Sequence, residues 1–567
     1  MNEKILLILL PYWSPLIPPM GISCLKSFLI EHGFETKTVD VNMDPRFQEL
    51  MDQYFDHLKE YLPLENRGNL YNTGHEVLRR HMMAHLHYQN EKEYTQLVQL
   101  LVSTTFFTSI GSTQAHRLQT IIDTFYARLS KYVLELLAKE NPTVLGLSVF
   151  TGTLPASLFV FQQAKKYNPR IKTLMGGGIF SGELDFHSPN FKYLLDRTPY
   201  IDHIFVGEGE VLFLKYLQKK LPTNQRVYTP ADIDNETLDL SYALPPDFSD
   251  LDIRYYPILA SYTSRSCPFT CAFCSETVLW GKYRKKKADQ IIEELNRLSG
   301  EYHTQLFLMS DSLLNPSMDG LSRAIIDAGL SLYWDGYLRV DPLACDPDQT
   351  FQWRCGGFYR ARLGLESASP RTLEAMGKRI TPAQIKETLA ALAQAGIKTT
   401  TYWVTGYPGE TEEDFQQTLN LLEEMKDDIY EADCNPFSYY LTGQVQSDRW
   451  AQEYQHRLLY PPETQQMLML QTWELDTPPF REEVFRRVNR LAEWCKKQDI
   501  PNPYSLREIK EADERWKKLH NNAVPPLAEF INAKNSKVIS IAENKHLKKI
   551  VRGQSTLTSE IDSGWGF

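Results

Sequence analysis

Cysteine is scarce in this chain, with eight in 567 residues, and three of those eight stand together in one short segment. Such a content does not build a disulfide framework, and it fits a reducing compartment. Basic residues are not in excess either, since the formal net charge is −10. We therefore expect no general surface for nucleic acid or anionic membranes.

Long hydrophobic runs are also missing. The apolar run at residues 5–10 is short and no small-residue cleavage site follows it, so a buried strand explains it better than a signal peptide. Residues 97–110 are interrupted by Gln, Ser and Thr and are too few to span a bilayer. With 42% hydrophobic and 23% charged residues, the chain has a globular composition. We expect a cytoplasmic protein of several domains without a membrane span.

Alternating strands and helices organise the first part of the chain, residues 1–215. This order predicts a Rossmann-like parallel α/β domain with right-handed connections. A stretch of helical pattern, residues 46–138, interrupts it and is expected to form an insertion that serves as a lid or partner surface. Strands are predicted at residues 5–10, 36–39, 144–149, 171–175 and 203–206.

Small or flexible residues follow several of these strands. Ligands of open parallel sheets bind outside the carboxyl ends of the strands. One glycine there can simply be a turn, but several together favour a broad, flat ligand that needs close backbone approach. The candidate binding residues are Tyr12, Ser148, Thr151, Gly176, Gly177, Gly178, Gly207 and Glu208.

A second α/β region, residues 251–440, follows a proline-containing stretch, 216–250, that we interpret as a linker. Strands alternating with helices predict a parallel barrel or partial barrel. Residues 441–567 show a helical pattern and are expected to form a cap over the barrel mouth. The predicted barrel strands begin at residue 258 and continue at 305–309, 331–334, 361–365, 399–404 and 437–440.

The three clustered cysteines, Cys267, Cys271 and Cys274, have the spacing C-x3-C-x2-C. A structural zinc site takes four ligands, and the nearest other candidates, His303 and Cys345, show no ligand-pair spacing. A disulfide would leave one cysteine over. An iron–sulfur cubane held by three thiolates keeps one iron open for an exchangeable ligand, and this interpretation is favoured.

The loop sequence Arg-Ser-Cys-Pro-Phe-Thr-Cys-Ala-Phe-Cys-Ser-Glu resembles the cluster loop of the radical S-adenosylmethionine (SAM) enzymes. Two later segments, 364–367 and 406–410, resemble the strand-end motifs with which that family contacts SAM. Residues 310–311 depart from the Gly-Gly-Glu of many members. The resemblance implies a 4Fe-4S cluster on the three cysteines and SAM contacts from Phe273, Ser310, Asp311, Arg339, Glu366, Ser367, Gly406 and Glu410.

The first domain is similar to the N-terminal cobalamin-binding domain of one class of these enzymes, through Pro-Pro-x-Gly at 18–21 and Val-Gly-Glu-Gly-Glu at 206–210. No D-x-H-x-x-G follows the first strand, so a histidine of that motif cannot be the lower cobalt ligand. The resemblance implies a cobalamin-binding domain, a partial (β/α)6 TIM-like barrel and a helical C-terminal cap.

The implied activity is that of a class B radical SAM methyltransferase. A 5′-deoxyadenosyl radical would activate an unactivated carbon, or a phosphorus centre, of a natural product, lipid or peptide, and methylcobalamin would supply the methyl group. An electron donor such as flavodoxin or ferredoxin would be needed. Ring formation or rearrangement without methyl transfer stays open, as does a non-catalytic cobalamin sensor. A transfer-RNA methylthiotransferase is rejected because the N-terminal domain holds only Cys24.

Overall fold

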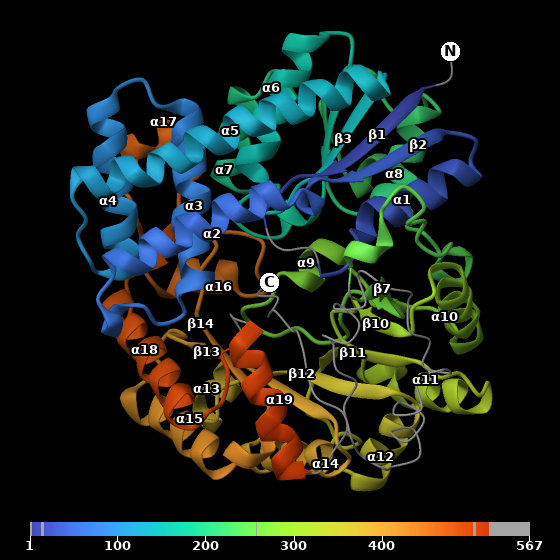
Figure 1. The fold of residues 1–567 in the computed structure, drawn as a ribbon, viewed down its shortest axis with the longest axis vertical. Helices are drawn as coiled ribbons and strands as arrows, with labels where there is room; N and C mark the ends of the chain where they lie inside the picture. The colour runs from blue at the N-terminus through green and yellow to red at the C-terminus, as the bar shows by residue number, and fades with distance from the viewer. Residues whose placement is uncertain (1–2, 13–15, 257, 503–505, 521–567) are drawn as a thin grey trace.

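Two six-stranded parallel sheets form the framework of the computed structural model (Figure 1), which describes residues 3–12, 16–256, 258–502 and 506–520. The N-terminal part of the chain, blue to teal in Figure 1, builds the first sheet. The green-to-orange part builds the second. The predicted fold class, an α/β chain with two parallel sheets, is confirmed.

The first sheet has the strand order β2-β1-β3-β4-β5-β6, so the chain reverses direction across the sheet between β1 and β3. Strand β1 is the apolar segment Lys-Ile-Leu-Leu-Ile-Leu, buried because helices cover both faces. The strands are β1 (Lys4–Leu9), β2 (Glu35–Asp40), β3 (Val144–Ser148), β4 (Lys172–Gly176), β5 (His203–Phe205) and β6 (Val227–Tyr228), and the accompanying helices are α1 (Met20–Glu31), α6 (Leu154–Tyr167), α7 (Pro189–Arg197) and α8 (Gly209–Leu217).

The segment expected to be a linker, 216–250, is not only a linker. Its residues Val227–Tyr228 form β6, which pairs in parallel with β5 and extends the first sheet. The prediction missed this strand because two residues carry no readable periodicity.

Four helices make up the insertion between β2 and β3, and their apolar faces merge with one face of the first sheet into a single core. His81 is buried there and its Nδ1 lies 2.9 Å from the hydroxyl of Tyr54. In the described part of the chain, no three His, Cys, Asp or Glu side chains are arranged to hold a single metal ion. The helices are α2 (Pro45–Tyr61), α3 (Leu70–His87), α4 (Glu91–Phe106) and α5 (Ser112–Glu140).

The second sheet follows the chain strand by strand, in the order β7-β10-β11-β12-β13-β14, which is the topology of a partial (β/α)6 barrel. Two of its helices begin with a capping box, formed by the side chains of Thr381 and Thr411. The strands are β7 (Leu259–Ser261), β10 (Leu306–Met309), β11 (Tyr333–Leu338), β12 (Phe358–Glu366), β13 (Lys398–Thr405) and β14 (Glu431–Pro436), and the helices are α10 (Ala288–Tyr302), α11 (Asn315–Asp327), α12 (Pro347–Cys355), α13 (Pro370–Ala375), α14 (Pro382–Gln394) and α15 (Glu412–Glu424).

The prediction of the last barrel strand was wrong. The strand lies at Glu431–Pro436 rather than at 437–440. Its polar sequence, Glu-Ala-Asp-Cys-Asn-Pro, hid it, because the inward-facing positions are polar and only Ala432 and Cys434 join the apolar core outside the barrel. Strand β11 likewise continues to Leu338, beyond the predicted end at residue 334.

In the described part of residues 441–567, an antiparallel pair of strands accompanies the helices. The last helix that the structure describes, α19 (Leu506–His520), lies at the end of the barrel opposite the cysteine loop. Asp513 and Trp516 of that helix pack among residues at the amino ends of the barrel strands, and Asp513 pairs with Lys398, the first residue of β13. The elements are α16 (Ser447–Glu453), β15 (His456–Leu458), α17 (Gln465–Leu468), β16 (Trp473–Leu475), α18 (Arg481–Lys497) and α19 (Leu506–His520).

No helix in the described part of the chain has both the length and the apolar character needed to cross a membrane.

Candidate active site around the cysteine loop

The three cysteines lie in the loop between β8 (Ser264–Arg265) and α9 (Glu276–Trp280), above the carboxyl end of β7. All three are free thiols and partly exposed. Backbone N–H groups of Phe269 and Glu276 donate to the sulfurs of Cys267 and Cys274 respectively, which lowers the pKa of each thiol. Burial acts in the opposite direction more strongly and raises the pKa of Cys274 to about 12.

The thiols interact electrostatically with one another, since Cys271 raises the pKa of both of its neighbours. Three thiols gathered on one loop, which would bind iron as thiolates, are a donor set that fits an iron–sulfur cluster. They do not fit a closed structural zinc site, which needs a fourth ligand.

Distant segments hold the cysteine loop in place. The N–H of Ala272 donates to the carbonyl of Met376, after α13, at 2.9 Å. Residues 438–447, which we call the bridging segment, hold the other side. Within it the N–H of Val445 donates to the Cys274 carbonyl at 3.0 Å, and Gln444 Nε2 donates to the Phe273 carbonyl at 2.9 Å. None of these partners is visible in the local sequence of the loop.

Arg339, predicted to contact SAM, lies at the end of β11 beside the cysteine loop. Its Nη1 is 3.5 Å from Cys271 Sγ, and its guanidinium lies over the ring of Phe269. Glu366, another predicted SAM contact, ends β12 with a φ of +65° and pairs with Lys378 at 3.0 Å. Ser367 Oγ accepts a hydrogen bond from the Ser369 N–H, and Ser310 is exposed. Arg339, Glu366 and Ser367 thus belong to neighbouring barrel strand ends.

Asp311, also predicted to contact SAM, is buried beside the segment that precedes the cysteines. Its carboxylate accepts hydrogen bonds from the N–H and hydroxyl of Thr263 at 2.9 and 2.7 Å and from the hydroxyl of Ser264. Burial raises the pKa of Asp311. Its two oxygens therefore fix the chain just before the cysteines, through contacts between residues almost fifty positions apart in the sequence.

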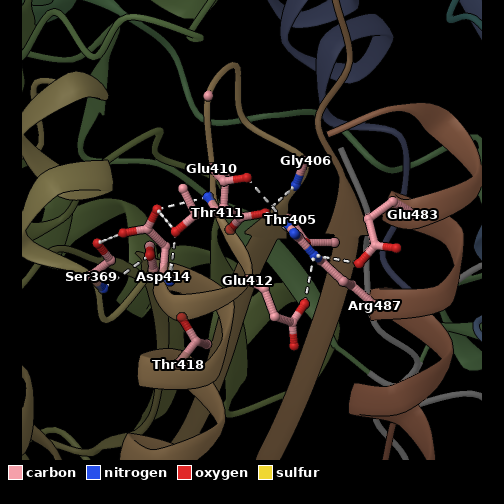
Figure 2. Close-up of polar contacts among 12 residues, drawn as sticks. Ser369, Thr405, Gly406, Glu410, Thr411, Glu412, Asp414, Thr418, Glu483 and Arg487 are labelled. Atoms are coloured by element: carbon pink, nitrogen blue, oxygen red, sulfur yellow. Dashed lines mark hydrogen bonds and ion pairs between the residues drawn. The ribbon is translucent and has the colours of Figure 1, made fainter. Parts of the chain in front are cut away.

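The carboxylate of Glu410 is occupied by hydrogen bonds and an ion pair within the protein (Figure 2). It accepts from the Gly406 N–H at 2.7 Å and the Thr405 hydroxyl at 3.0 Å, and it pairs with Arg487 of α18 at 2.9 Å. Gly406 has a φ of +85°, and a Cβ there would meet Val484 of α18. The segment predicted to contact SAM, 406–410, therefore joins β13 to a C-terminal helix that local sequence did not connect with it.

At the edge of the first sheet, the predicted glycines serve two purposes. Gly177 has a φ of +113°, and a Cβ there would lie 2.5 Å from the Val149 carbonyl oxygen, so this residue lets two backbones pack. Gly176 is open, with one atom, the Phe205 carbonyl oxygen, 3.9 Å from where its Cβ would be. Gly178 lies against the ring of Phe150. Of these three glycines, Gly176 has the most free space around the position that a Cβ would take.

The other predicted residues of this edge are held by neighbouring segments. Tyr12 packs its ring on Gly152 and on His75 of the insertion, with ring centroids 4.9 Å apart in the second contact. Thr151 is exposed and borders a cavity of about 10 Å³, room for one water, lined also by Arg79 and Glu183. Ser148 ends β3 opposite Gly176.

Glu208 was predicted to bind a ligand at the edge of the first sheet. Its carboxylate forms ion pairs with Arg265 and Arg284, which flank the cysteine loop in sequence. Glu210 also pairs with Arg265, at 2.6 Å. Gly207, with a φ of +97°, makes the turn that directs the two glutamates toward these arginines.

These contacts bring the two strand edges together. Helix α9, directly after the last cysteine, contacts the short helix η3 (Gly178–Ser181) at the edge of the first sheet. The bridging segment touches the same edge, because a Cβ on Gly182 would lie 3.3 Å from the ring of Tyr440. The cysteine loop and the glycine-rich edge therefore face a common region of the molecule.

Comparison with known proteins defines the class of the barrel. Residues 261–422 match the model of the Radical SAM superfamily, so the barrel is a radical SAM domain. Such a domain binds a 4Fe-4S cluster and SAM.

Particular relatives match about half of the chain. It is 25% identical over 327 residues to the anaerobic magnesium-protoporphyrin IX monomethyl ester cyclase of Rubrivivax gelatinosus, a match that covers 52% of this chain and 57% of that protein. It is 28% identical over 321 residues to an uncharacterized methyltransferase of Pyrococcus horikoshii, covering 52% of this chain and 66% of that protein. The chain thus spans between half and two thirds of the length of these relatives.

Among solved structures, the radical SAM methyltransferase TsrM from Kitasatospora setae, determined with cobalamin and a [4Fe-4S] cluster bound, superposes with a TM-score of 0.60 at 12% sequence identity. The superposition covers 94% of this chain and 99% of that chain. At this identity the likeness establishes a shared fold, including the sheet that precedes the barrel.

Proposed function

We propose that this chain is a cobalamin-dependent radical SAM methyltransferase acting on a carbon or phosphorus centre of a small molecule, a lipid or a peptide. The observation that carries the proposal is the meeting of the cysteine loop with the glycine-rich edge of the first sheet, through the contact of α9 with η3. The cysteine loop and the glycine-rich edge face the same region of the molecule, so a cofactor bound at each could act on one substrate.

When bound, the cluster and SAM supply a 5′-deoxyadenosyl radical, and cobalamin supplies a transferable methyl group. In the proposal, the three cysteines hold the cluster, and Arg339, Glu366 and Ser367 lie where SAM would bind. The open backbone at Gly176 would receive the corrin. The insertion and the bridging segment would exclude water from the radical. His75 of the insertion packs on Tyr12 at that edge, and Tyr440 of the bridging segment lies against Gly182 there.

In this proposal the cluster also requires a source of electrons. The cluster must take one electron from an external donor of the flavodoxin or ferredoxin class, because the described residues include no second group of cysteines. The described part of the first domain holds a lone buried cysteine, Cys24, which has no partner of that kind.

The second candidate is ring formation or rearrangement with the same cofactors but without methyl transfer. The observation that favours this second candidate is the match, at 25% identity, to a protein named as a cyclase. A non-catalytic cobalamin sensor is the third; the intact set of three cysteines on a loop fixed from two sides speaks against it.

The test is anaerobic reconstitution of the full chain with iron, sulfide and cobalamin, followed by incubation with methyl-labelled SAM, a reductant and an extract of the source cells. Methyl transfer predicts S-adenosylhomocysteine and 5′-deoxyadenosine together with a labelled product. 5′-Deoxyadenosine without S-adenosylhomocysteine indicates the second candidate. Absence of both products from an enzyme with a full cluster would support the sensor.

A further inference from the structure

The backbone of Arg339 is fixed by two hydrogen bonds to one side chain, that of Asn315. Its backbone N–H donates to Asn315 Oδ1 at 2.8 Å, and its carbonyl accepts from Asn315 Nδ2 at 2.8 Å. Asn315, the first residue of α11, is itself fixed by a hydrogen bond to Asp341 at 2.6 Å. The carboxyl end of β11 is therefore clamped, and the origin of the Arg339 side chain is fixed.

The guanidinium is fixed from the other side by the cysteine loop. Its central carbon lies 4.1 Å from the ring centroid of Phe269, which stands between the first two cysteines in sequence. From that stacked position Nη1 reaches Cys271 Sγ at 3.5 Å. Arg339 is 6% exposed and Cys271 is partly exposed, so the arginine end of the contact is the one shielded from water.

The charge of Arg339 is unusual among the buried cations of the barrel. Lys378, Arg360 and Arg362 each form an ion pair with a carboxylate. Within the described ranges no carboxylate pairs with Arg339, and its Nη2 is buried without a hydrogen-bond partner. A buried cation without a carboxylate is costly unless it faces negative charge.

We infer that Arg339 sets the reduction potential of the cluster by donating a charge-assisted hydrogen bond to the Cys271 thiolate. This inference rests on the proposed cluster but not on cobalamin or on methyl transfer. Reduction adds a negative charge to a group already bounded by three thiolates. A fixed cation and a hydrogen bond to a ligand sulfur favour the reduced state, and such contacts are among the determinants of cluster potentials.

Arg339 is on this view a positioning and tuning residue that acts through Cys271. It differs from the role predicted from the family resemblance, in which the same residue contacts SAM. The two roles separate experimentally, because the potential can be measured before any SAM is added.

The experiment is a redox titration of the reconstituted full-length protein without SAM, followed by the electron paramagnetic resonance signal of the reduced cluster. Arg339→Gln should shift the midpoint potential to more negative values and lower the reduced fraction at a fixed applied potential. Arg339→Lys, which keeps the charge, should recover part of the shift. Arg323→Gln, an exposed arginine on the same helix as Asn315, should titrate like the unchanged protein.

Phe269→Leu provides an independent variant, since it removes the stacking surface while leaving the charge. It should shift the potential in the same direction by less. If Arg339→Gln assembles too little cluster to titrate, the midpoint potentials of Arg339→Lys and Phe269→Leu test the inference instead.

Midpoints equal to that of the unchanged protein in every variant that holds a full cluster overturn the inference. Weaker SAM binding by Arg339→Gln at an unchanged potential also overturns it, and assigns the residue to SAM. A protein that shows the shifted potentials but makes no methylated product leaves the inference intact and counts against the proposed function alone.

Discussion

The two parallel sheets of this protein solve the problem of burial in different ways. In the first sheet, both faces of the strands are apolar and helices cover them. In the barrel, the outer face is apolar, while the inner face combines apolar residues such as Leu306 and Leu308 with the buried ion pairs Arg360–Glu431 and Arg362–Asp335. The first sheet can present backbone at its edge, whereas the barrel presents charged side chains that depend on distant partners.

The difference shows at the two edges that meet. Glycines at the first edge permit close packing of backbones, as at Gly177 beside Val149. At the barrel edge, carboxylates such as Asp311 and Glu410 fix the loops by several hydrogen bonds each. Substitutions at the barrel edge should therefore destabilise the protein by removing hydrogen bonds and ion pairs. Substitutions of glycine at the edge of the first sheet should destabilise it by steric conflict with the neighbouring backbone.

The largest effect is expected at the barrel mouth. Cys271→Ala removes one of three cluster ligands and should reduce SAM cleavage to background, measured as 5′-deoxyadenosine formed per cluster. Cys345→Ala, which removes a cysteine outside the loop, is the matched control and should keep the activity. Full cleavage activity in the Cys271 variant would refute the cluster assignment.

The next prediction compares the loss of stability caused by one core substitution in each sheet. Arg362→Met leaves Asp335 buried without its cation and should lower the free energy of unfolding by about 3–5 kcal/mol. Ile8→Val in the first sheet removes one methylene and should cost about 1 kcal/mol. Both are measured by denaturant unfolding. The double variant Arg362→Met with Asp335→Leu should recover most of the loss, and no recovery would contradict the interpretation of the pair.

A smaller effect compares glycines at the two edges. Gly177→Ala and Gly406→Ala each force an alanine into positive φ and should cost about 1–3 kcal/mol. At Gly406 the Cβ would meet the Val484 side chain, so adding Val484→Ala should return part of the stability. At Gly177 the conflict is with the backbone of Val149, so trimming its side chain should return nothing. Equal rescue at both sites, in thermal unfolding, would show that the edges do not differ in this way.

The smallest effect concerns pH. Burial lowers the pKa of His81 to about 3, from an ordinary value of 6.5. Its stabilising contribution is therefore complete above the unfolded pKa and is lost as the pH falls from about 6.5 toward 3. Between pH 7 and pH 6 the loss should be roughly 0.7 kcal/mol. His81→Phe should flatten that part of the stability curve, whereas His116→Phe, at an exposed position, should leave it unchanged.

Local sequence determined much of this protein. The spacing of the three cysteines fixes which side chains one loop can gather, because the distances along a few residues are limited by covalent geometry. Apolar runs and capping residues likewise located β1, β3, β13 and the helices after Thr381 and Thr411, since these signals act within one turn or one strand.

Tertiary structure decided the partners of the charged groups. Glu208 and Glu410 were expected to contact cofactors, and the fold pairs Glu208 with Arg265 and Glu410 with Arg487. The polar strand β14 and the position of α19 at the amino ends of the barrel strands were hidden for the same reason. A charge buried in a low-dielectric interior must find an opposite charge, and the sequence does not say which distant one the fold will bring to it.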